Sequence, residues 1–142
     1  MKRTLKQRLT ADHGVSVIEF ALVVPLLMLV VFAAIDFTRA YFTQNQVASA
    51  VRAGARYAAV QASPMSSATQ AQIKQVVRQF GAQLGGAGIT DDQIQIVMNN
   101  ATGEVTVSVV GYQFSLITPL ARAVGVGTLP ITKRATFRWE WS

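Results

Sequence analysis

The sequence lacks cysteine entirely and has one histidine, His13, which lies in a short basic segment at the N-terminus. The absence of cysteine excludes a disulfide scaffold and a thiolate metal site. Without a further histidine, a Ser-His-Asp or Cys-His centre and a histidine-based zinc or haem site are not expected. No P-loop or dinucleotide fingerprint occurs either. The sequence therefore predicts a protein that is not an enzyme, with no cofactor, no metal and no small-molecule substrate.

Charge is also scarce, because charged residues make up 14% of the chain and hydrophobic residues 51%. That charge content is low for a purely soluble domain. A net charge of +6 could indicate nucleic-acid binding, but the basic residues form no patch interleaved with aromatics. No nucleic-acid partner is predicted. The basic residues that precede the long apolar run are Lys2, Arg3, Lys6 and Arg8.

The longest run without a polar residue extends from Phe20 to Ile35, and further apolar residues precede it from Val15. As a helix, residues 15–35 span about 30 Å, the thickness of a bilayer core. The basic N-terminus predicts a single-pass protein of the cytoplasmic (inner) membrane, with a cytoplasmic N-terminus and an extracytoplasmic C-terminal domain. An ordinary signal peptide fits poorly, since the run is too long and no A-x-A site follows it directly.

One carboxylate, Glu19, lies near the start of this apolar segment. A charge there costs a few kcal/mol, so an intramembrane acid is a functional hypothesis. The alternative interpretation is that Glu19 lies at the headgroup boundary and stays hydrated. Gly14 ends the polar leader, and Glu19 is the fifth residue after it. The pattern of leader, glycine, spacing and membrane acid resembles the class III signal of type IV prepilins.

That resemblance implies cutting after Gly14 by a prepilin peptidase, with residues 1–14 removed as a cytoplasmic leader. Glycine has no side chain and breaks a helix, so the Gly14–Val15 bond could enter an active site in extended form. The new amine of Val15 would lie four residues before Glu19, on the same side of a helix. Glu19 would then pair with that amine, in its own chain or in the next subunit of a filament.

Residues 14 to about 59 are further similar to the N-terminal module of the TadE-like family, the minor pseudopilins of the tight-adherence (Flp) pilus. The similarity is looser at Leu129-Pro130-Ile131-Thr132 and from Ala135 to Glu140. It implies a structural or assembly role in type IV pilus biogenesis, with other pilin and pseudopilin subunits and the assembly platform as partners. The segments that carry it are Glu19-Phe20-Ala21, Pro25-Leu26-Leu27, Asp36-Phe37-Thr38-Arg39-Ala40 and Val51-Arg52-Ala53-Gly54-Ala55-Arg56-Tyr57.

Two alternatives remain open at this point. One is an uncleaved single-pass anchor whose outer domain binds another envelope component, and the other is a type II secretion pseudopilin. A type II secretion pseudopilin would be processed in the same way. A test of cleavage therefore distinguishes the pilus hypothesis from the uncleaved anchor but not from the secretion pseudopilin.

The long helix is expected to continue to residue 60, with a kink at Pro25 and an ion pair between Asp36 and Arg39. A stripe at helical spacing follows the membrane segment. Its part beyond Gln44 is expected to pack on the chain's own head, while another face meets neighbouring subunits. The stripe residues are Phe37, Tyr41, Ala48, Val51, Ala55 and Ala58.

Residues 61–142 are predicted to form the head. A polar loop with a serine or threonine cap precedes an amphipathic helix with apolar residues from Ile73 to Leu84, stopped by Gly85-Gly86. A hairpin is expected over residues 94–109 around a turn at 99–103, and a last strand from Ile131 to Trp141. Residues 112–127 are predicted to be a loop with a short helix at 120–124. The fold class is thus α+β and pilin-like: a long transmembrane helix, a second helix and a small antiparallel sheet.

Three groups in the head have competing interpretations. Aromatic residues of the last strand are predicted to lie in the core, with a contact surface for another pilin as the alternative. Asp91-Asp92 is expected to serve a loop rather than to bind a divalent cation. Four arginines are expected to form a solvated face. The aromatic residues are Phe137, Trp139 and Trp141, and the arginines are Arg52, Arg56, Arg134 and Arg138.

Overall fold

The computed structural model describes residues 3–61, 66–82, 84, 88–118, 121 and 125–139. The described part has two helices followed by three strands, which confirms the predicted α+β class. The elements are α1 (Arg3–Val60), α2 (Ser67–Gly81), β1 (Ile94–Asn99), β2 (Glu104–Ser115) and β3 (Thr128–Arg138).

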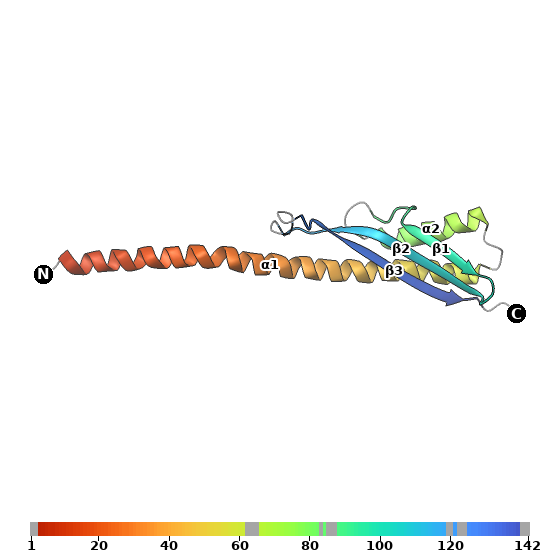
Figure 1. Ribbon diagram of the computed structural model, residues 1–142, viewed down its shortest axis with the longest axis horizontal. Helices are drawn as coiled ribbons and strands as arrows, with labels where there is room; N and C mark the ends of the chain where they lie inside the picture. Colours follow the sequence, from red (N-terminus) through yellow and green to blue (C-terminus); the bar gives the residue numbers. More distant parts are fainter. Residues whose placement is uncertain are drawn as a thin grey trace.

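Helix α1 has two halves with different surroundings (Figure 1). Its N-terminal half projects alone, and its C-terminal half lies along the sheet and α2. The helix continues through Pro25 without interruption. It also begins at Arg3, so Gly14 lies inside a helix. The expected helix break at Gly14 is therefore not present, and an extended Gly14–Val15 bond would require local unwinding.

The predicted hairpin is confirmed, and the sheet is antiparallel with the order β1-β2-β3. The side chain of Asn99 accepts a hydrogen bond from the Ala101 backbone N–H at 3.1 Å, which holds the turn that joins β1 to β2. Gly103 closes this turn with a φ of +66°, a backbone conformation that favours glycine. β3 ends at Arg138, and Trp141 lies outside the described residues.

Strand β2 is longer than the sequence predicted, because residues 112–115 continue it rather than forming a loop. The register with β3 shifts between Val109 and Tyr112, where β2 holds one residue more than its partner. Gly111 takes a φ of +70° in this bulge. The bulge moves the inward face of β2 from odd to even positions, so Tyr112 and Phe114 are buried beyond it. The expected helix at 120–124 lies almost entirely outside the described residues.

The core lies between one face of the sheet and the two helices. Its α1 positions recur every three or four residues, as a helical face requires. Phe37 and Tyr41 of the predicted stripe are instead exposed, by 75% and 63%. The expected packing of the stripe on the head beyond Gln44 is therefore confirmed. Buried residues of the core are Val47, Ala50, Val51, Ala55, Ala58, Ile73, Val77, Leu84, Ile89, Ile94, Val105, Val107, Val109, Tyr112, Phe114 and Ile131.

Close packing of α1 on α2 depends on Gly54. A Cβ at this position would lie 2.4 Å from Cγ2 of the fully buried Val77. The N-terminus of α2 has the predicted cap, since the Ser66 hydroxyl accepts a hydrogen bond from the Thr69 backbone N–H at 3.1 Å. The helix ends at Gly81, earlier than predicted, and Gly85-Gly86 lies outside the described residues.

Candidate functional site

The membrane-facing half of α1 carries the predicted processing residues. No residue from 14 to 35 is buried, and Val15 and Glu19 are exposed one helical turn apart. Among the described residues, one helix is long and apolar enough to cross a membrane. Its most apolar window has a mean hydropathy of 2.7 and no buried residue. This unburied apolar surface fits a single-pass membrane anchor.

The one buried charged side chain among the described residues is Asp36, which is 4% exposed. It lies directly after the predicted membrane span and joins α1 to the chain segment that follows β2. Its carboxylate accepts hydrogen bonds from the backbone N–H of Ile117 at 2.9 Å and of Thr118 at 2.8 Å. The Thr118 hydroxyl donates to the same carboxylate. We call this arrangement the Asp36 clamp.

Arg39 completes the clamp from the next turn of α1. Its guanidinium lies 3.4 Å from the Asp36 carboxylate, which confirms the predicted pair. The same guanidinium stacks over the Phe114 ring, 5.2 Å from the centroid. The sequence indicated Arg39 as the partner of Asp36, but it did not indicate the two amides and the hydroxyl more than eighty residues away.

The clamp favours the ionised form of its carboxyl group. Burial acts to raise the pKa of Asp36, but hydrogen bonds from the Thr118 hydroxyl and the two backbone amides, with the charge of Arg39, hold that pKa below its ordinary value of 3.8. Asp36 is therefore a carboxylate at neutral pH. It accepts hydrogen bonds and, being ionised, has no proton to donate as an acid.

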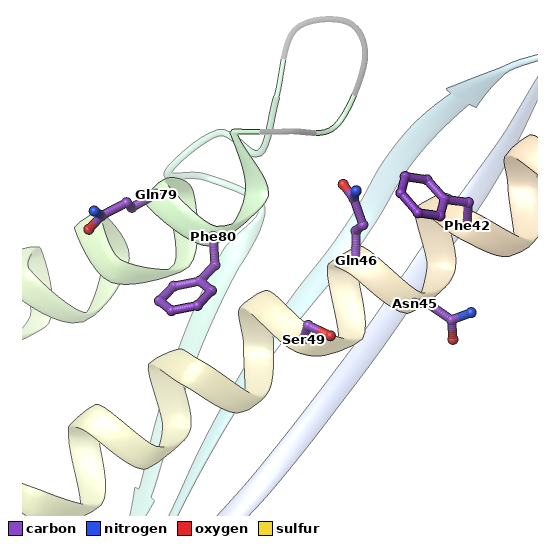
Figure 2. Close-up of a pocket in the computed structure, with 6 residues that line it drawn as sticks. All are labelled: Phe42, Asn45, Gln46, Ser49, Gln79 and Phe80. Atoms are coloured by element: carbon purple, nitrogen blue, oxygen red, sulfur yellow. The ribbon is translucent and has the colours of Figure 1, made fainter.

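The face of α1 that points away from the core is hollowed along α2. One open hollow of about 550 Å³ lies between the two helices (Figure 2). Phe80 projects from α2 into the space between the helices, while Gln79 points away from α1. Phe80 is 57% exposed, so it is a surface residue although it belongs to the predicted amphipathic helix. The residues that line the hollow are Phe42, Asn45, Gln46, Ser49, Gln79 and Phe80.

A second hollow, of about 790 Å³, continues along α1 and brings Arg52 and Arg56 beside Phe80 and Phe137. Phe137 is 37% exposed at this hollow, and Trp139 packs half-buried against the core. All four arginines of the predicted solvated face are exposed.

The described residues gather no set of three histidine, cysteine, aspartate or glutamate side chains that could hold a metal ion. Asp91 instead pairs with Arg78 at 3.2 Å, and its carbonyl accepts a hydrogen bond from Lys74 at 3.0 Å. Both contacts tie the turn before β1 to α2. The role in a loop that the sequence favoured for Asp91 fits this geometry.

Comparison with protein families finds a match in the first half of the chain. The model described as TadE-like protein matches residues 14–56, from Gly14 to Arg56. This segment is similar to the TadE-like family. The match confirms the resemblance stated from the sequence, and it suggests a protein associated with the Tad (Flp) pilus. It contains Glu19 and the Asp36–Arg39 pair, and it ends within the part of α1 that packs on the head. A search of curated proteins finds no match, and neither does a search of solved structures.

Proposed function

We propose that this chain is a minor pseudopilin, a structural and assembly subunit of a tight-adherence (Flp) type IV pilus rather than an enzyme. The observation that carries the proposal is the TadE-like module of residues 14–56, which begins at the glycine of the processing motif. The unburied apolar half of α1 and the head packed on its other half support the same role. Such a subunit would be made as a membrane protein and then incorporated into a filament or used to prime one.

Processing by a prepilin peptidase is the first step of this role. The peptidase would cut the Gly14–Val15 bond on the cytoplasmic side and leave a free amine on Val15. Since Glu19 is exposed one turn further along α1, its carboxylate is available to that amine. In a low-dielectric filament core the pair would fix the register of neighbouring subunits. The exposed face of α1 along the two hollows would remain available to those subunits.

N-terminal sequencing of the chain extracted from membranes tests the proposal, with and without co-expressed prepilin peptidase. We expect Val15 as the first residue only when the peptidase is present. Gly14→Leu should block the cut, because it places bulk at the scissile bond. Ala21→Leu adds comparable bulk away from the bond and should be cut normally. A chain that keeps its leader in both samples would contradict the proposal and favour an uncleaved membrane anchor with an outer binding domain.

A further inference from the structure

The end of the head where β2 passes to β3 lies beside the middle of α1 (Figure 1). We call its described residues, 116–118, 121 and 125–129, the tip. A cavity of about 430 Å³ lies between the tip and α1, beside the Asp36 clamp. Leu29 and Ala33 line it from the helix, and Leu116 and Leu129 line it from the tip. Two residues of the membrane span therefore share a cavity with the head.

The cavity extends along α1 from Ala40, beyond the predicted span, to Leu29 within it, so Leu29 marks the deepest level that the cavity reaches. Leu29 precedes the end of the span at Ile35 by about 9 Å along the helix axis, at about 1.5 Å per residue. The span of about 21 residues only just crosses a core of about 30 Å, so it has no excess length to lift Leu29 out of the membrane. Moving α1 outward by that distance would instead draw residues 9–14 into the bilayer, and the charge of Asp12 among them would cost a few kcal/mol.

The chemistry of the tip suits a bilayer boundary. Ile117, Val126 and Leu129 are exposed by 49%, 48% and 40%. The nine described residues of the tip include no charged side chain. On α1, just beyond the span, Phe37 and Tyr41 are exposed too, at the level where membrane proteins place aromatic residues.

Several backbone amides of the tip also have hydrogen-bond acceptors within the protein, as a segment with little access to water requires. The amides of Ile117 and Thr118 donate to the Asp36 clamp. The Leu116 amide donates to the Gly127 carbonyl at 3.0 Å, and the Val126 amide donates to the Ala121 carbonyl at 2.8 Å. Because unsatisfied backbone groups are costly in lipid, internal partners of this kind are what an inserted segment requires.

We propose that the tip rests in the headgroup and upper acyl region of the leaflet on the side of the head, as a second membrane contact beside α1. A bilayer is the occupant because the cavity under the tip is lined by residues of the span itself. The deepest lining residue, Leu29, lies about 9 Å inside the span, which is within the range of about 5–10 Å at which interfacial segments are buried. The Asp36 clamp fixes the tip to the helix, so the head is held close to the membrane in a defined orientation. This inference depends on the membrane anchor of the uncut chain and not on pilus assembly.

Single-cysteine labelling tests the proposal, and the chain has no cysteine of its own to interfere. Ile117→Cys and Val126→Cys would each carry an environment-sensitive NBD group on the full chain in nanodiscs of phosphatidylcholine and phosphatidylglycerol. Iodide would quench labels in water, and lipids with a shallow nitroxide would quench labels in the headgroup region. Val97→Cys, on an exposed position of β1, is the aqueous control, and Leu22→Cys is the embedded control.

We expect both tip labels to be quenched by the shallow nitroxide lipid and to resist iodide about threefold better than the Val97 label, as interfacial burial requires. Iodide quenching equal to that of the Val97 label would overturn the proposal. Protection from both quenchers would also overturn it, since the labels would then be covered by protein. Far-UV circular dichroism checks that each labelled chain is folded, and the use of two tip positions protects the test against a local defect at one of them.

Discussion

Asp36→Ala removes the carboxylate that joins α1 to the segment after β2, and its effect can be estimated from the clamp. The substitution leaves the backbone amides of Ile117 and Thr118, now 2.9 and 2.8 Å from this carboxylate, without their acceptor. Hydrogen bonds to a charged group contribute about 1.5–3 kcal/mol each, and they are not additive here because the segment can detach and hydrate. We therefore expect a loss of about 2–4 kcal/mol in the free energy of unfolding, a large part of a typical stability of 5–15 kcal/mol.

The assay for this prediction combines thermal unfolding with hydrogen exchange on the full chain in detergent micelles. A loss of this size lowers the Tm by roughly 10–20 °C in a domain of this size. The amides of Ile117 and Thr118 should lose protection first. Asp91→Ala is the matched control, because Asp91 forms one ion pair and its side chain is 53% exposed. Exposed ion pairs contribute about 0–1 kcal/mol to stability, so the Tm of the control variant should stay close to that of the wild type.

The pH dependence of stability is a second test of the predicted contribution of Asp36. The pKa of Asp36 is lower in the folded chain than its ordinary value of 3.8, so the folded state favours the ionised carboxyl group. The resulting stability is fully present above the unfolded pKa and is lost as pH falls through the folded pKa. The wild type should thus lose stability below about pH 4, and this loss should be smaller in Asp36→Ala. Unchanged Tm and unchanged amide protection in the variant would refute the clamp.

Three further substitutions test other parts of the argument. Gly54→Ala places a methyl group against Val77 and should destabilise the head by about 1–2 kcal/mol in thermal unfolding, since overpacking outweighs the gain in helix propensity; a stabilised variant would contradict the close approach. Gly111→Ala forces a Cβ into a φ of +70° and should cost about 1–2 kcal/mol in the same assay, with wild-type stability as the opposing result. Glu19→Val should permit cutting after Gly14 yet reduce pilus assembly, measured by filament yield and adherence, and normal pili would exclude the proposed pairing.

Periodicity was sufficient to predict the helices and the hairpin, because each depends on residues close together in the sequence. It failed at residues 112–115 for a physical reason. Gly111 adds one residue to β2, so the alternation of buried and exposed positions changes phase in the middle of the strand. A glycine inside an alternating pattern was the available signal, since it is typical of a bulge.

The candidate site was predictable only in part, because its contacts join distant parts of the chain. Arg39 lies one turn from Asp36, and helical spacing was sufficient to predict that pair. The Ile117 amide is 81 residues away, and backbone donors leave no mark in the sequence. The useful signal was the position of Asp36 itself. A carboxylate that ends a long apolar run must find donors, and the segment nearest to the membrane is where they lie.

The structure divides α1 at Asp36 into halves with different partners. Before Asp36 no described side chain from residue 14 onward is buried, whereas the helix beyond it contributes five residues to the core. The outer half is therefore stabilised by the head, but the inner half can be covered only by lipid or by other proteins. An exchange of lipid for neighbouring subunits would leave the head's own core contacts unchanged. Only the tip, which is fixed to Asp36 and overlaps the span, would have to leave the membrane in that exchange. The Asp36 clamp thus couples extraction of the helix to release of the head, and the cost of moving the exposed apolar surface of the tip into water would oppose premature extraction.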